Sequence, residues 1–306
     1  MTHPVALRTR IYVDGFNLYY GCLKGTSYKW LDLQRLLFDL VLSGVNIGPD
    51  AIAPPVTPAS PLIKYFTAPI HKNFAKADDS VSSQAQYHRA LRGHLGDAIQ
   101  IIDGYFDARR TMQHKYQQNT LARDCEKIEV WKLEEKQSDV ALALHAFGDA
   151  VRGEVDQVVV VSNDTDLVPA LAMVGEHTAA KIGLVIPTRQ RVRAVNAALE
   201  KLADWTRDHL PDSELAAAQL PSMVKHEGKP VHKPLSWYPR PDLLAPIFVE
   251  AKRVKRSAGA AWKWLHSPAE HLAGRLPVEM ASTDETAAEL RRYMATYARD
   301  FGLARD

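Results

Sequence analysis

Four consecutive valines, Val158 to Val161, predict a buried strand. A run of β-branched side chains that is apolar on both faces is typical of a strand inside a parallel sheet. The chain then turns polar from Ser162 onward, and leucine and valine recur at helical spacing after that. Asp164 and Asp166 are therefore expected where a strand ends and a helix begins, which is where open α/β sheets bind ligands. A simple helix cap is the alternative, because one short polar side chain is enough for that role.

Strand and helix patterns alternate along the first two thirds of the chain. Further strands are predicted at 10–14, 62–67, 99–106 and 180–187, with helices at 81–95, from 134 onward and across 192–202. Residues 44–61 and 107–123 are interpreted as loops, and 128–132 as a candidate short strand. The alternation predicts an α/β fold with a parallel sheet and helices on both of its faces.

The pattern changes near Pro211. Nine of the 18 prolines lie at or beyond this residue, and no further strong strand pattern follows. Basic residues at 252–256 precede Trp262 and Trp264, a combination that suits nucleic acid, although core positions for the two tryptophans explain it equally well. We expect two parts: a domain over residues 1–210, and a proline-rich linker with a mainly helical C-terminal extension of unknown role over 211–306.

Composition narrows the class of protein. The chain has 306 residues, 46% of them hydrophobic, and no run approaches the ~20 apolar residues of a membrane-spanning helix. The N-terminus has no apolar segment typical of a signal peptide, and Cys22 and Cys125 are the only cysteines. We therefore expect a cytoplasmic protein with reduced thiols and no membrane partner. The net charge of +2 decides little by itself.

Carboxylates recur at the predicted junctions. Asp14 follows the first strand, Asp139 lies at the start of a helix, and Asp164 and Asp166 follow the valine strand. In a parallel sheet these positions meet at one edge, where like charges repel unless they take up protons or a cation. Oxygen-only ligands favour Mg²⁺ or Mn²⁺, ions that suit phosphodiester hydrolysis. For Asp139 the alternative is a structural one, since the helix dipole stabilises a negative charge in a first turn.

Three segments, 11–19, 134–140 and 161–169, resemble the signature blocks of the NYN domain family, which belongs to the PIN-like metal-dependent nucleases. The resemblance covers roughly residues 8 to 205. It implies a PIN-like central parallel sheet, an acidic Mg²⁺ or Mn²⁺ pocket and cleavage of RNA. Carried over by position, the catalytic and metal-binding residues would be Asp14, Asp139, Asp164 and Asp166, with Asn17 and Ser162 as polar supports. Gln137 stands where many relatives have glycine, which would alter the start of the helix.

The function predicted from these observations is that of a metal-dependent endoribonuclease leaving 5′-phosphate and 3′-hydroxyl ends. Basic residues expected to bind the RNA backbone are Lys72, Arg109, Arg110, Lys115, Arg189, Arg191 and Arg193. The alternative is a catalytically weak RNA-binding or protein-interaction module, with a protein partner or a second copy bound through the C-terminal extension. A metal-dependent phosphatase is a third candidate, against which Asp14-Gly15-Phe16 lacks the second aspartate of a phosphoaspartyl motif.

Overall fold

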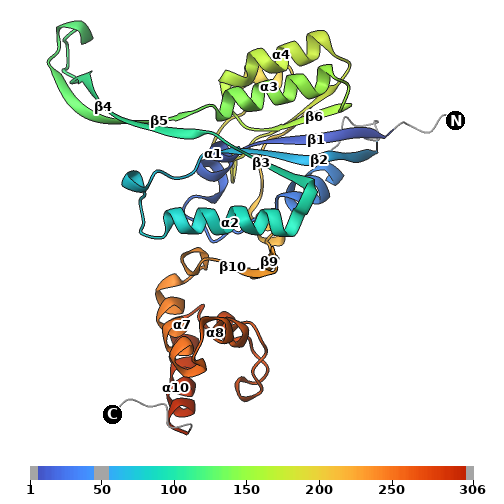
Figure 1. The fold of residues 1–306 in the computed structure, drawn as a ribbon. Helices are drawn as coiled ribbons and strands as arrows, with labels where there is room; N and C mark the ends of the chain where they lie inside the picture. The colour runs from blue at the N-terminus through green and yellow to red at the C-terminus, as the bar shows by residue number, and fades with distance from the viewer. Residues whose placement is uncertain (1–5, 45–54, 301–306) are drawn as a thin grey trace.

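The computed structural model describes residues 6–44 and 55–300. Its centre is a six-stranded sheet with the order β3-β2-β1-β6-β7-β8, in which every neighbouring pair runs parallel (Figure 1). The strands are β1 (Leu7–Asp14), β2 (Val56–Thr67), β3 (Ile99–Asp103), β6 (Gln157–Val161), β7 (Lys181–Val185) and β8 (Trp205–Arg207). The predicted parallel sheet is confirmed, and β8 is a strand that the sequence pattern did not reveal.

Helices cover both faces of the sheet (Figure 1). One face carries α3 (Ser138–Val151) and α4 (Val168–His177), and the other carries α2 (Ser80–Leu95) and the helical segment Arg35–Val41. The valine strand supplies both cores, because Val158 and Val160 pack under α3 and α4 while Val159 and Val161 pack on the opposite face. This division explains why an all-apolar strand was needed at the centre of the sheet.

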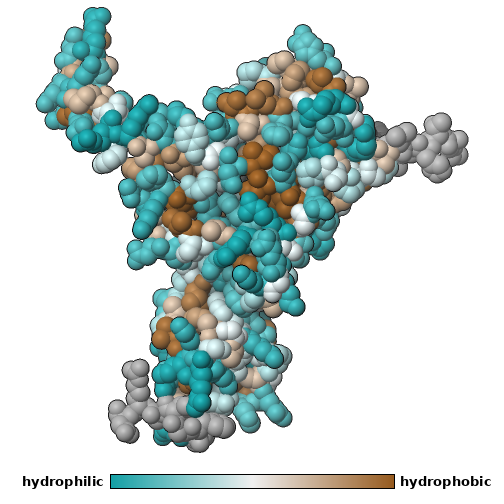
Figure 2. All heavy atoms as spheres, in the orientation of Figure 1, coloured by the Kyte–Doolittle hydropathy of each residue, from teal (hydrophilic) through white to brown (hydrophobic). Residues whose placement is uncertain are grey.

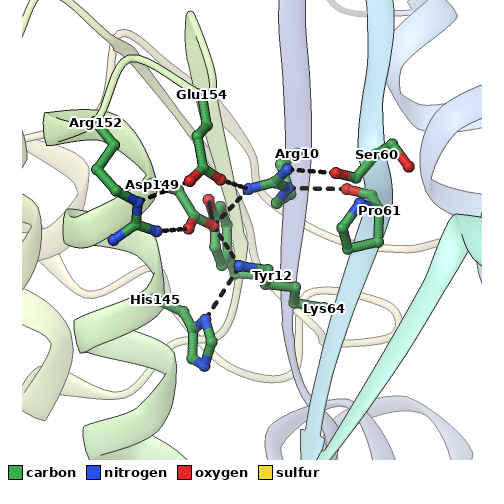
Figure 3. A network of polar contacts seen from close by, with 9 residues as sticks. All are labelled: Arg10, Tyr12, Ser60, Pro61, Lys64, His145, Asp149, Arg152 and Glu154. Atoms are coloured by element: carbon green, nitrogen blue, oxygen red, sulfur yellow. Dashed lines mark hydrogen bonds and ion pairs between the residues drawn. The ribbon is translucent and has the colours of Figure 1, made fainter.

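A buried network of charges joins α3 to the sheet (Figure 3). Asp149 on α3 has no solvent-exposed side-chain surface, and its Oδ2 atom lies 2.6 Å from Lys64 Nζ and 2.7 Å from Arg10 Nη1. Tyr12 donates a hydrogen bond of 2.8 Å to the same oxygen, and Arg152 contacts Oδ1 at 2.6 Å. The network fixes α3 against β1 and β2.

A long antiparallel ribbon projects from the domain (Figure 1). It consists of β4 (Tyr105–His114) and β5 (Lys127–Lys136), which pair only with each other. The predicted loop at 107–123 is therefore wrong for its first eight residues, and Glu134 and Glu135 belong to a strand and not to the start of α3. Both faces of the ribbon are largely in water, so its residues show no simple alternation of polar and apolar positions.

The remaining elements are short or C-terminal. They are α1 (Gly15–Leu18), α5 (Ala197–Glu200), α6 (Asp212–Ala217), β9 (Met223–His226), β10 (Lys229–His232), α7 (Pro241–Lys255), α8 (Ala258–Leu265), α9 (Pro277–Met280) and α10 (Asp284–Asp300). The helix predicted across 192–202 is reduced to α5. The hairpin β9–β10 occupies a region where no strand was predicted. Of the predicted loop at 44–61, residues 45–54 lie outside the described residues, and 56–61 belong to β2.

The C-terminal third divides between two cores. Leu215, Val224 and Val231 join the core beneath α2, whereas α7, α8 and α10 form a separate core of their own. Trp262 is buried and stacks on His232, which fits the structural explanation for this tryptophan. The division at residue 210 stays a prediction. No helix in the described part of the chain is long and apolar enough to cross a membrane.

Candidate functional site

The candidate site lies between β1 and β6, where successive strands begin to be added on opposite sides of the sheet. From the central pair β1 and β6, the sheet continues through β2 and β3 on one side and through β7 and β8 on the other. Asp14 ends β1, and Ser162 directly follows β6 at the same edge. Such a switch point leaves room between the two diverging connections, and ligands of open α/β sheets bind there.

Asp14 is the buried member of the site, with 4% of its surface exposed. Its Oδ2 atom accepts hydrogen bonds from Asn17 Nδ2 at 2.6 Å and from Ser162 Oγ at 2.8 Å, and Oδ1 accepts one from the Asn17 backbone at 2.9 Å. Burial raises the pKa of this carboxyl, although the hydrogen bonds act in the opposite direction. Asn17 and Ser162 thus lie in contact with Asp14, as polar supports would.

Gly15 allows the chain to turn directly after Asp14. A Cβ atom at this position would lie 2.7 Å from the carbonyl oxygen of Phe66 and 2.8 Å from the hydroxyl of Tyr65. No larger residue fits without moving backbone atoms, so the glycine holds β1 close to β2 at the edge of the site.

Asp139 is the most electrostatically perturbed carboxyl of the site. Burial first, and then the nearby charges of Asp14, Asp164, Glu135 and Asp166, raise its pKa to about 6. The charges of Asp14, Asp164 and Asp166 therefore act on Asp139, and none of the four predicted carboxylates forms a salt bridge with lysine or arginine among the described residues. Glu135 is an additional member that the sequence did not indicate, because its position depends on the register of β5.

Asp164 and Asp166 follow β6 with different exposures. Asp164 accepts a hydrogen bond of 3.0 Å from the backbone of Asp166 and so caps the short helical turn Thr165–Leu167. The capping alternative therefore applies to Asp164, while Asp166 is exposed at the rim. A capping carboxylate retains a free oxygen, so this role does not remove Asp164 from the site.

The start of α3 is strained and incompletely bonded. Gln137 precedes the helix with φ of 82°, in the left-handed region that glycine adopts most easily, and its side chain makes no capping hydrogen bond. Ser138 is 3% exposed, and its hydroxyl has no hydrogen-bond partner. The structure thus gives a physical reason for the glycine expected at this position from the resemblance.

The predicted RNA-binding residues differ in the partners that they contact. Arg189 is paired with Asp212 and Arg191 with Asp208, each at 2.7 Å. Arg109 and Arg110 lie on β4, where they face carboxylates of the ribbon, and Lys115 follows β4. Lys72 and Arg193 have no salt bridge among the described residues.

Arg193 lies in a loop attached to the site. Asn163, between Ser162 and Asp164, donates a hydrogen bond of 2.9 Å to the Ala194 carbonyl and accepts one of 2.9 Å from the Asn196 backbone. The loop that follows β7 is thereby held beside the acidic edge, with Arg193 next to one of its two anchor points.

The carboxylates do not form a preassembled metal centre. Within residues 6–44 and 55–300, no three His, Cys, Asp or Glu side chains are placed to hold a metal ion together. The residues as they stand do not fit the implied Mg²⁺ or Mn²⁺, and we assign no catalytic step to such an ion. The metal requirement itself stays a prediction.

Comparison with known proteins adds three findings. The NYN domain model matches residues 55–205, a range that excludes β1 and Asp14. The 6-hydroxy-3-succinoylpyridine 3-monooxygenase of Pseudomonas putida is 45% identical over 297 residues, which are 95% of this chain and 95% of that protein. A protein of unknown function from Vibrio parahaemolyticus has a crystal structure with a TM-score of 0.40 and 18% identity, covering 69% of this chain and 98% of that one.

The second finding corrects the functional prediction. A relative of this similarity across both chains is named as a monooxygenase, not as a ribonuclease. The predicted metal-dependent endoribonuclease is therefore wrong as a function and as an enzyme class, and so is its alternative, a binding module without useful catalysis. The acidic edge of the sheet remains the candidate site.

Proposed function

This chain belongs to the NYN domain family, and from that premise we propose that it uses the acidic edge of the fold as a monooxygenase of a hydroxylated pyridine with an acidic side chain. The observation that carries the proposal is the 45% identity to the Pseudomonas putida monooxygenase over 95% of both chains. The aligned length extends well beyond residue 205, so the similarity includes most of the C-terminal third as well as the domain that the family shares.

A monooxygenase reaction sets definite requirements. One atom of O₂ forms a new bond to the ring carbon that carries the acyl side chain, the bond from this carbon to the side chain breaks, and the other oxygen atom leaves as water. With the acyl group released as an aldehyde, the balance takes four electrons and four protons, which two equivalents of a reductant such as reduced nicotinamide supply from solution. The protein must therefore bind the ring, set its protonation state and admit O₂.

Asp139 is the residue we assign to control of the proton. With a pKa of about 6 it is mostly a carboxylate at neutral pH, yet it is more basic than an ordinary aspartate. Accepting the proton of the substrate hydroxyl would make the pyridine ring more electron-rich and so more reactive toward an electrophilic oxygen species. Asp14 is assigned a positioning role, because both of its oxygens already accept hydrogen bonds.

Arg193 is the residue we assign to the acidic side chain of the substrate. Of the three arginines in its loop, Arg189 and Arg191 are engaged with aspartates. Arg193 forms no salt bridge among the described residues, and Asn163 holds its loop beside the acidic edge. A guanidinium there suits a carboxylate at the far end of a substrate whose ring lies near Asp139.

The proposal is tested by isotope incorporation. Purified protein is incubated with 6-hydroxy-3-succinoylpyridine, reduced nicotinamide and ¹⁸O₂, with and without added flavin, and the products are analysed by mass spectrometry. We expect a hydroxylated product that contains one ¹⁸O atom. Failure to consume the pyridine under all of these conditions, or oxygen derived only from water, would contradict the proposal.

Replacing Arg193 should separate binding from chemistry. We expect Arg193→Ala to raise KM for the same pyridine about 10-fold to 100-fold with little change in kcat, since a charge-assisted contact far from the reacting carbon is lost. Arg191→Ala is the matched control, because that arginine is already paired with Asp208. Equal effects of the two substitutions would rule out a specific role for Arg193.

A further inference from the structure

The β4–β5 ribbon exposes an unusual amount of apolar surface. We define the arm as residues 105–136. By register, Trp131 lies opposite Arg110 and Leu133 opposite Ala108, so these side chains share one face with Met112. Trp131 is 64% exposed and Met112 55%, and Phe74 is the ring that contacts Trp131 from the domain. A two-stranded ribbon alone is marginally stable in water, so a partner on this face is physically expected.

A second exposed apolar surface lies on α3 and α4, and we call it the stripe. Val140, Leu144 and Val151 recur at helical spacing on α3 and are 64%, 66% and 54% exposed, and Met173 on α4 is 41% exposed. Figure 2 shows hydrophobic residues at the surface over these two helices. Contiguous exposed apolar residues on a helix are typical of an interaction surface.

We propose that the arm of one copy of this chain packs on the stripe of a second copy, and that the second arm is exchanged in the same way. The arm projects away from its own α3, so it does not cover its own stripe (Figure 1). In a dimer with a two-fold axis, each arm covers the stripe of the other copy, so both arms and both stripes are buried. Two-fold symmetry is the usual form of a homodimer. No other partner is needed to account for either surface.

The area of the two surfaces is sufficient for a stable dimer. Strands of ten residues are about 33 Å long, and two paired strands are about 10 Å wide, so one face of the arm offers about 330 Å². Two exchanged arms and the surfaces beneath them would bury about 1,300 Å² in total, within the about 1,200–2,000 Å² of specific interfaces.

Two lysines of the arm are complementary in charge to the acidic edge. The arm as a whole is nearly neutral, with seven lysine and arginine residues against six aspartate and glutamate residues. Lys115 and Lys127, near its free end, form no salt bridge among the described residues. The stripe begins at Val140, directly after Asp139, and the carboxylates of the acidic edge have no cationic partner in the described part of the chain. The proposed dimer offers these carboxylates to the two lysines of the other copy.

Two independent variants test the dimer by sedimentation equilibrium across the micromolar range. One is Leu144→Glu, at an exposed position of the stripe. The other replaces residues 108–133 by Asn-Gly, which joins the paired residues Asp107 and Glu134 through a tight turn and removes Met112, Trp131 and Leu133. We expect the wild-type chain to be dimeric and each variant to weaken association about 100-fold or more, because one places a charge in the interface and the other removes the contact face.

A mixing experiment adds a sharper criterion. The Leu144→Glu variant retains its arm, and the shortened-arm variant retains its stripe, so a mixture of the two can restore one of the two exchanged contacts. We expect the mixture to associate more strongly than either variant alone. Val249→Glu, at an exposed position of α7, is the control and should leave the dimer unchanged. A monomeric wild-type chain, or a dimer insensitive to both interface variants, would overturn the proposal.

Discussion

We expect Asp149→Ala to lower the free energy of unfolding by about 3–5 kcal/mol, a large fraction of the stability of an ordinary domain. The aspartate is fully buried and is the shared partner of Lys64 and Arg10, whose side chains are 7% and 3% exposed. Without it, Lys64 would remain inside the protein with no compensating charge, and Arg10 would keep only the partly exposed Glu154, 3.0 Å away. Burial alone would raise the pKa of Asp149, but hydrogen bonds from Lys64, Arg10 and Tyr12 lower it, so the network should also be lost as pH falls below the ordinary aspartate range.

Urea denaturation provides the measurement, and Arg152→Ala provides the control. Arg152 contacts the same aspartate but is 57% exposed, so its removal should change stability by less than about 1 kcal/mol. The two variants differ mainly in burial and should separate clearly. A loss below about 1 kcal/mol for Asp149→Ala would show that the network does not hold α3 in place.

The second large effect is on activity. Asp139→Asn should reduce kcat for hydroxylation about 100-fold or more, because asparagine cannot accept the substrate proton. In the wild-type enzyme, kcat/KM should rise as pH increases through about 6, where Asp139 loses its proton. The activity that remains in the variant should not show this rise in kcat/KM with pH. A profile unchanged by the substitution would exclude Asp139 as the base.

Stability supplies the control for this substitution. The pKa of Asp139 is raised from 3.8 to about 6 in the folded protein, so the native state binds the proton more tightly and loses relative stability as pH rises across that interval. Above pH 6 the variant should therefore be more stable than wild type by about 1–2 kcal/mol, after allowance for solvent screening. The difference should vanish below pH 4. Loss of activity with a gain of stability cannot be attributed to misfolding.

The sheet and the position of the acidic edge could be predicted from the sequence because their signals are local. The valines of β6 and the polar residues after them identify a strand that ends at a site without any knowledge of distant contacts. The arm could not be predicted in the same way, because its strands pair only with each other. They bury too little surface to require a regular alternation of polar and apolar residues in the sequence. The membership of Glu135 in the site depends on that pairing and was missed with it.

The chemistry was predicted wrongly for a related reason. Carboxylates at a switch point indicate where a ligand binds, and mutual repulsion indicates that they need protons or a cation. Neither property distinguishes phosphodiester hydrolysis from oxygen insertion into an aromatic ring. The prediction is contradicted by the 45% identity, over 95% of both chains, to a protein named as a monooxygenase, and motif spacing in the first domain could not reveal that similarity.

The hydrogen bonds of Asp14 and Asp164 have a consequence for mutagenesis in this family. Both side chains fasten the turn at the end of their own strand, through Asn17 in one case and Asp166 in the other. If a variant at either position were inactive, two causes could not be separated. The carboxylate would be missing from the reaction, and the turn that it fastens would also be less well held. Asp139 makes no such attachment among the described contacts, and it is the acid whose replacement can be interpreted in chemical terms alone.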